Sequence, residues 1–233
     1  MAEPDSSEFF KGENADRYDE RFDKLAPLKD ALHLLTRLVL QDLPADARIL
    51  CVGAGTGAEI FYLAELFPGW RFLAVDPSSD MLEKLERKAQ SAGLSERIDV
   101  HEGFLESAPD TAPFDAATSL LVSQFILDRE KRLGFFEEIA ARLRPGGHLV
   151  AADLCTDLNA PAGEAMLDIW TAAFRLAGEG EEMVARFRDS LRANVAVVVP
   201  EAVRALIAEG GFADPLQIYQ GGLIHAWAAR KAG

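Results

Sequence analysis

The sequence predicts an α/β fold, in which a doubly wound and mostly parallel sheet of seven strands ends in an antiparallel strand. Two observations carry this prediction. Short apolar runs alternate with helical patterns between residues 48 and 152, and such alternation builds a parallel sheet with right-handed crossovers. Near the carboxyl end, two strand patterns flank a Gln-Gly-Gly turn, which is typical of an antiparallel hairpin.

The predicted elements begin with a helix at 28–40, whose apolar residues recur at helical spacing. Strands are then predicted at 48–52, 71–75, 98–101, 114–121 and 148–152. Helices are predicted between them at 58–67, 78–92 and 129–143, and only the strands at 98–101 and 114–121 follow each other without a helix. Ser78 or Ser79 is the expected N-cap of the helix at 78–92, and Gly93 is expected to end it. Arg144-Pro145-Gly146-Gly147 predicts a turn before the strand at 148–152.

Residues 157–194 interrupt this alternation with two helical patterns, at 161–176 and 179–192. Because this insertion follows the fifth strand, it is expected to lie above the strand tips as a helical lid. We expect one domain over residues 1–233, with an N-terminal helical arm at 1–45. The remaining elements complete the sheet: a helix at 201–209 and strands at 216–219 and 223–229.

The composition is acidic, with 38 Asp and Glu against 24 Lys and Arg and a net charge of −14. A surface of this charge repels phosphate backbones, so no nucleic-acid partner is expected. The sequence starts without a leader pattern and has no membrane-spanning apolar run, so we expect a cytoplasmic protein with no membrane partner. Cys51 and Cys155 are too few for a disulfide framework and lack metal-ligand spacing, so no metal is expected.

A glycine loop at 51–57 follows the first predicted strand. Glycine lacks a Cβ, so such a turn can approach a bound molecule closely, and the N–H groups of the next helix face that molecule. Asp76 ends the second strand, where a carboxylate can accept hydrogen bonds from a ribose diol. A nucleoside cofactor is therefore the first hypothesis. Read as G-x-G-x-x-A, through Gly53, Gly55 and Ala58, the loop fits an NAD site, and a turn without any ligand is the other alternative.

Read as G-x-G-x-G, the same loop resembles the first motif of the class I S-adenosylmethionine-dependent methyltransferases. The helix before the first strand, Asp76, the run 143–147 before the fifth strand and the carboxyl-terminal hairpin are also similar to that family. The resemblance spans residues 28–155 and 200–229 and implies a Rossmann-like fold with S-adenosylmethionine as the cofactor.

The resemblance also implies which residues would contact the cofactor. The glycines of the loop would line its methionine and ribose portion, and the acid that ends the second strand would accept from both ribose hydroxyls. Residues after the second and third strands would pack around the adenine, and the stretch from Leu120 to Ser123 would face the sulfonium and the methyl acceptor. The implied cofactor-binding residues are Cys51, Gly53, Ala54, Gly55, Gly57, Asp76, Pro77, Met81, Gly103, Phe104, Leu105 and Leu120.

Two of these positions depart from the family pattern. Cys51 stands where the family often has an acid, and Phe104 stands where it commonly has Asp. Phe104 is expected to cover the adenine by stacking instead. Both departures bear on the strength of cofactor binding.

Ser123-Gln124-Phe125, the helical insertion and the run 209–212 look similar to the bacterial enzymes that make carboxy-S-adenosylmethionine. Those enzymes need an arginine for the extra carboxylate, at a position that Leu206 occupies here, with Arg204 nearby. The leading hypothesis is methyl transfer from S-adenosylmethionine to a small-molecule acceptor. Carboxy-S-adenosylmethionine synthesis and a non-catalytic nucleoside-binding module are the alternatives. Methyl transfer needs alignment more than a catalytic triad, so no catalytic residue is assigned, and the acceptor and a homodimer are left open.

Overall fold

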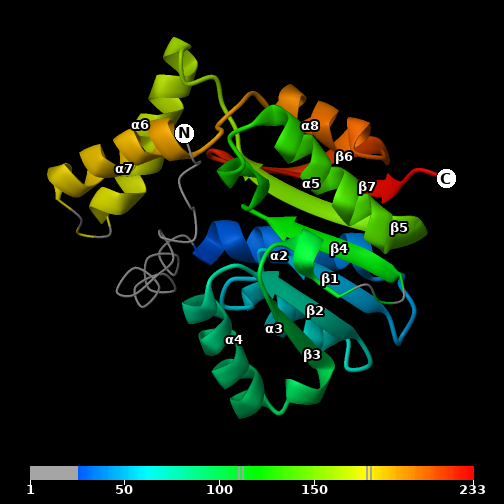
Figure 1. Cartoon of the computed structure of the whole chain (residues 1–233). Helices are drawn as coiled ribbons and strands as arrows, with labels where there is room; N and C mark the ends of the chain where they lie inside the picture. The colour runs from blue at the N-terminus through cyan, green and yellow to red at the C-terminus, as the bar shows by residue number, and fades with distance from the viewer. Residues whose placement is uncertain (1–25, 110, 112, 177, 179) are drawn as a thin grey trace.

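The computed structural model describes residues 26–109, 111, 113–176, 178 and 180–233. One sheet holds the strands β1 (Arg48–Val52), β2 (Arg71–Asp76), β3 (Ile98–Glu102), β4 (Phe114–Leu120), β5 (Leu143–Leu154), β6 (Phe212–Gly221) and β7 (Ile224–Lys231). Their order is β3-β2-β1-β4-β5-β7-β6 (Figure 1). Strands β1 to β5 are parallel, whereas β7 runs antiparallel to both β5 and β6. The predicted fold class is confirmed.

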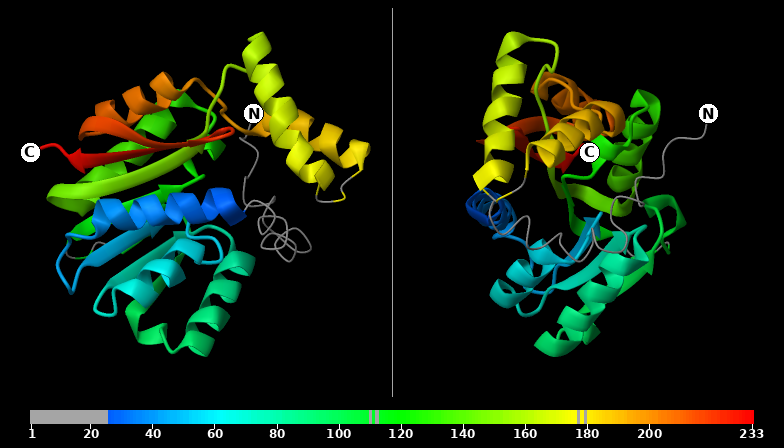
Figure 2. Two further views of the ribbon diagram at one scale, coloured as in Figure 1. Left: turned by 180° about the vertical axis from the view of Figure 1, so that it is seen from behind. Right: turned by 90° about the vertical axis from the view of Figure 1, so that its left-hand side faces the viewer.

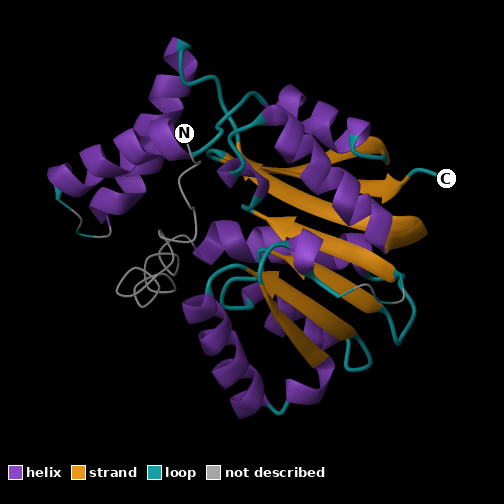
Figure 3. Cartoon of the chain, viewed as in Figure 1, coloured by secondary structure: helices purple, strands orange, loops and turns teal. Residues whose placement is uncertain are grey.

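Helices cover both faces of the sheet, as the two views of Figure 2 and the colouring of Figure 3 show. They are α2 (Ala26–Leu40), α3 (Ala58–Leu66), α4 (Ser79–Ala92), α5 (Arg129–Arg142), α6 (Pro161–Leu176), α7 (Glu181–Asn194) and α8 (Pro200–Glu209). Phe136 of α5 and Ile207 of α8 are fully buried in the apolar core on one face. Leu63 of α3 and Leu85 of α4 are fully buried in the core on the other face. Burial of this apolar surface holds the helices on the sheet.

The parallel strands end at one edge of the sheet, where Asp76 of β2 pairs with Glu102 of β3 and Leu120 of β4 pairs with Ala152 of β5. Helices α6 and α7 lie beyond this edge, to the left of the sheet in Figure 1. In sheets of this kind, ligands bind outside the carboxyl ends of the strands. The fold therefore brings the glycine loop, Asp76 and the insertion to the same end of the molecule.

The sequence predicts most helix ends correctly, because caps are local. The Ser78 hydroxyl accepts a hydrogen bond from the Met81 N–H at 3.4 Å, and Gly93 ends α4 with a φ of 69°. These are the two caps that the sequence indicates.

Two strand boundaries differ from the prediction. The run Arg144-Pro145-Gly146-Gly147 lies inside β5 as an irregularity, where the register against β4 shifts between Phe114 and Ala116. Strand β6 begins at Phe212 and not at the predicted residue 216. Phe212 and Ala213 already pair with β7, and the register of this pairing then shifts between Ala213 and Leu216. Both errors have the same cause, since pairing with a neighbouring strand continues through residues that look like turn formers.

Part of the predicted N-terminal arm, residues 1–25, lies outside the described residues. Its remainder includes α2, which forms the predicted helix before β1. Within the described ranges, no helix combines the length and apolar character needed to cross a membrane.

Candidate functional site

The glycine loop has the backbone geometry that only glycine adopts easily. Gly53, Gly55 and Gly57 have φ values of 69°, 53° and 81°, in the left-handed region. A Cβ on Gly53 would overlap the side chain of Val122, and one on Gly57 would lie 2.9 Å from the ring of Phe61. A Cβ on Gly55 would meet no protein atom within 4 Å. The loop is thus closely packed on its protein side and open at Gly55.

Asp76 is tied directly to this loop. One carboxylate oxygen accepts the Gly55 N–H at 2.8 Å, and the other accepts the Ser78 N–H at 2.8 Å. Only 8% of Asp76 is exposed, and burial raises the pKa of its carboxyl while the two N–H donors oppose that rise. Each carboxylate oxygen can accept a second hydrogen bond. Asp76 can therefore hold the loop and still accept two hydroxyl groups of a ligand.

A second buried acid, which the sequence motifs do not indicate, follows the loop in the first turn of α3. Glu59 stands two residues after Gly57 in the first turn of α3 and is 8% exposed. Burial, with a smaller contribution from the charge of Asp76, raises the pKa of Glu59 to about 7. The sequence held one signal for it, an acidic residue at the start of a helix that is otherwise largely apolar.

Glu59 bears on the choice between the nucleoside cofactors. In a dinucleotide site, the pyrophosphate rests on the N-terminus of the helix that follows the glycine loop. Here an acid, Glu59, lies buried in the first turn of that helix. Its ionised carboxyl would repel a diphosphate and attract a nucleoside with a cationic group, whereas Asp76 suits the ribose of either cofactor. The first turn of α3 therefore favours a cationic cofactor over NAD.

The residues expected around the adenine lie after β2 and β3. Met81 is buried at 2% exposure, Pro77 is half-buried, and the Gly103 N–H donates to the Asp76 carbonyl at 3.0 Å. Phe104 is 60% exposed, so its ring is accessible for stacking. Leu105, by contrast, is buried in the core on the α5 face. The structure thus brings four of these five residues to the edge that holds Asp76 and places Leu105 within the core.

Cys51 and Leu120 complete the predicted set, together with Ala54, which is buried in the loop. The Cys51 side chain is fully buried below the loop, and burial raises the pKa of its thiol well above the usual range. Leu120 is half-buried at the tip of β4, next to Leu121, which has a φ of 64°. A left-handed conformation is unusual for leucine and marks a strained turn at this edge.

An apolar cluster lies between the strand tips and the insertion, with partly buried residues such as Leu121 and Met166 at its margin. Leu32 of α2, Leu120 of β4 and Trp170 of α6 belong to it, together with Leu191 of α7 and Leu223 of the β6–β7 turn. Trp170 is only 6% exposed, so its ring packs within the cluster and does not form an exposed aromatic cage. The insertion therefore presents an apolar face to the end of the sheet at which the glycine loop lies.

The arginines of the insertion are paired with acids. Arg175 pairs with Glu181 at 2.6 Å and Arg186 pairs with Glu182 at 2.6 Å, both exposed. Arg188 and Arg192 both reach Glu164 of α6, and Arg188 also reaches Asp168. All of these ion pairs except Arg186–Glu182, which lies within α7, join α6 to α7. Acids of α6 rather than of α7 hold Arg188 and Arg192.

Comparisons with known proteins agree with this geometry. A family described as "Methyltransferase domain" matches residues 49–147. The demethylmenaquinone methyltransferase of Thermus thermophilus is 31% identical over 173 residues, which are 72% of this chain and 75% of that protein. The carboxy-S-adenosyl-L-methionine synthase of Campylobacter curvus is 24% identical over 215 residues, covering 92% of this chain and 90% of that protein. The solved structure of human N-acetylserotonin methyltransferase in complex with SAM has a TM-score of 0.62 at 19% identity, covering 100% of this chain and 60% of that chain.

Proposed function

This chain belongs to the class I S-adenosylmethionine-dependent methyltransferases, and we propose that it methylates a small, uncharged and largely apolar acceptor. Its cofactor is S-adenosylmethionine, so NAD and a non-catalytic module are set aside. The observation that carries the proposed acceptor class is the apolar cluster between the strand tips and the insertion. The name of the Thermus relative, a demethylmenaquinone methyltransferase, supports a small-molecule acceptor.

The proposed cofactor site uses the residues at the edge of the sheet. Gly53, Gly55 and Gly57 would let the backbone approach the cofactor, with the open side of Gly55 turned toward it. The spare acceptor capacity of Asp76 would take the ribose hydroxyls. The accessible ring of Phe104 would stack on the adenine. The bound cofactor supplies a methyl group already activated on a sulfonium, so the protein has to align the acceptor and exclude water.

The acceptor would lie between the β4 tip and the insertion. We propose that residues 157–194 cover it as a lid and that the chain folds as one domain. Leu120, Leu121 and Met166, which are partly exposed at the margin of the apolar cluster, would supply apolar contacts. The four described arginines of the insertion are paired with acids, as set out above, which leaves no free guanidinium for an anionic acceptor among the described residues of the insertion. A neutral acceptor avoids the cost of burying a charge there.

Carboxy-S-adenosylmethionine synthesis has less support. Leu206, at the position where that enzyme needs an arginine, is 4% exposed and packs in the core on the α5 face. Arg204 is exposed on α8. Neither residue offers a cation for an extra carboxylate at the carboxyl edge of the sheet.

The acceptor class can be tested by mass spectrometry. The purified protein would be incubated with S-adenosylmethionine carrying a labelled methyl group, together with neutral phenols and quinols and their carboxylate-bearing counterparts. We expect label in the neutral compounds and a much slower reaction with the carboxylates. Transfer confined to carboxylates or to RNA would contradict the proposal, and a carboxylated cofactor formed from prephenate would establish the alternative.

A further inference from the structure

Glu59 occupies a position in which a carboxyl group is uncommon. It lies in the first turn of α3 and is 92% shielded from solvent, as its exposure of 8% shows. The N-cap residue of this helix, Gly57, supplies no side-chain acceptor, and the Glu59 carboxyl accepts the Glu59 N–H itself. Lys and Glu side chains are rarely buried without a partner, so this carboxyl needs an explanation.

The described groups around Glu59 do not neutralise its charge. On β1, the Cys51 thiol interacts electrostatically with Glu59 and stays uncharged because burial raises its pKa, and on β2 the Asp76 carboxylate adds a charge of the same sign. On α2, the centroid of the His33 ring lies 5.6 Å from that of Tyr62 of α3, and burial lowers the pKa of His33 to about 4, so it is neutral as well. On α4, the apolar Leu85 packs near Gly57. Within the described part of the chain, no Lys or Arg forms an ion pair with Glu59.

We propose that the Glu59 carboxyl supplies the negative charge that the glycine loop lacks at Cys51, and thereby selects the sulfonium form of the cofactor over the neutral thioether left after methyl transfer. The proposal rests on the cofactor lying against the loop, as proposed above. A buried carboxylate interacts strongly with a nearby cation because few water molecules screen the pair. The methyl donor and its product differ by one positive charge at sulfur. The Glu59 carboxylate would therefore bind the methyl donor more tightly than the product.

The sign of the pH dependence follows from this arrangement. In the free protein, burial raises the pKa of Glu59 to about 7. A bound cation favours the ionised carboxyl and lowers that pKa, so binding of S-adenosylmethionine releases a proton. Its affinity should rise as the pH increases through about 7. The affinity for S-adenosylhomocysteine should rise less, because that ligand carries the same ammonium group but lacks the sulfonium charge.

Calorimetric titrations with both ligands at pH 6 and pH 8 test the proposal. In the wild-type protein, the affinity for S-adenosylmethionine relative to S-adenosylhomocysteine should rise between these values, by at most about tenfold, the limit for a carboxyl whose pKa in the free protein is about 7. Glu59→Gln should remove that rise. Glu65→Gln is the matched control, because Glu65 is an exposed acid on the same helix, and it should behave like the wild type.

A second measurement needs no variant. Titration of the wild type at pH 7 in two buffers of different ionisation enthalpy counts the protons released, and we expect more release with S-adenosylmethionine than with S-adenosylhomocysteine. Equal release with the two ligands, or an unchanged pH dependence in Glu59→Gln, would overturn the inference about Glu59. Absence of binding by either ligand would instead contradict the cofactor site, so the two failures are distinguishable.

Discussion

At the scale of single residues, the site is built from backbone geometry and buried carboxyl groups. Gly55 and Gly93 show what the backbone alone contributes. Their φ values are 53° and 69°, and a Cβ on either residue would meet no protein atom within 4 Å. Only Gly55 faces the proposed cofactor, since Gly93 ends α4 at the far end of that helix. Substitutions at these two glycines therefore separate the cost of backbone strain from the loss of ligand contact.

Gly55→Ala and Gly93→Ala should lose similar stability, about 1–2 kcal/mol each, the cost of a left-handed alanine. Only Gly55→Ala should weaken S-adenosylmethionine binding, by at least about tenfold, because its methyl group would occupy the open side of the loop. Urea unfolding and calorimetry measure the two effects. Unchanged binding in Gly55→Ala would mean that the cofactor does not lie against the loop.

At the scale of elements, the insertion is anchored to the strand tips by a buried ion pair. Arg132 of α5 and Asp153 of β5 are 2% and 1% exposed, with Nη2 and Oδ2 3.2 Å apart. The Ser123 hydroxyl donates to Asp153 at 2.6 Å and accepts from Arg132 at 3.0 Å. Arg132 also donates to the Ala196 carbonyl at 3.0 Å, at the point where the chain returns from the insertion. The same cluster thus holds the β4 tip and the base of the insertion.

Arg132→Met should lower the free energy of unfolding by about 3–5 kcal/mol, because it leaves the Asp153 carboxylate buried without a cation. Arg132→Met combined with Asp153→Asn should cost less than the sum of the two changes. Arg129→Met is the control, since Arg129 on the same helix pairs with Glu209 at the exposed surface, and it should change stability little. Additive effects in denaturant unfolding would show that the pair is not coupled.

The elements that the sequence predicts correctly are those defined by local patterns. The glycine loop, Asp76 and the Ser78 cap can be recognised because each depends on residues within one turn or one strand end. The start of β6 was missed because its pairing resumes across a register shift. Glu59 and the Arg132–Asp153 pair could not be predicted, since burial of a charged residue depends on what packs over it in the folded chain.

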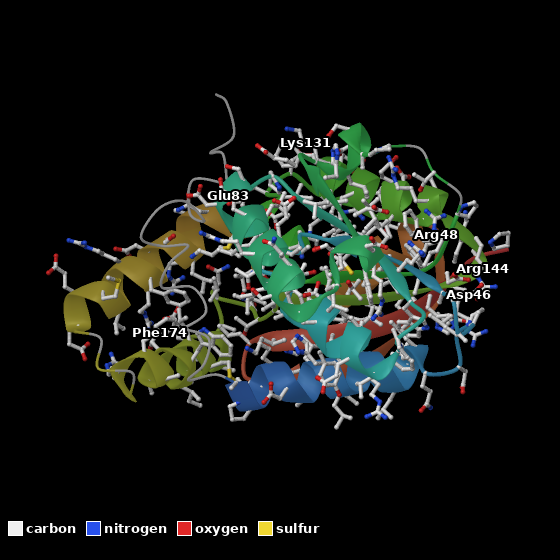
Figure 4. All side chains as sticks on the ribbon, turned by 90° about the horizontal axis from the view of Figure 1, so that it is seen from below. Asp46, Arg48, Glu83, Lys131, Arg144 and Phe174 are labelled. Atoms are coloured by element: carbon white, nitrogen blue, oxygen red, sulfur yellow. The ribbon has the colours of Figure 1, made fainter. Side chains whose placement is uncertain are left out.

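At the scale of the whole molecule, the two ends of the sheet differ in chemistry. Phe174, labelled in Figure 4, lies on the insertion at one end. Arg48 and Arg144, labelled at the opposite end, bind Asp115 through the Arg48 backbone N–H at 2.8 Å and the Arg144 guanidinium at 2.9 Å. That end is stabilised by surface polar contacts, while the apolar cluster and the buried acids lie toward the insertion. The oligomeric state is open, and sedimentation would distinguish a monomer from a homodimer.

The central claim is that S-adenosylmethionine binds at the carboxyl edge of the sheet, against the loop and Asp76. Calorimetric titration of the wild type, Asp76→Ala and Asp99→Ala tests it most directly, where Asp99 is an exposed acid of β3 and serves as the control. We predict micromolar binding by the wild type and by Asp99→Ala, and binding at least about 100-fold weaker in Asp76→Ala, equal to about 2.7 kcal/mol. No binding by the wild type at millimolar cofactor, or unchanged affinity in Asp76→Ala, would contradict it.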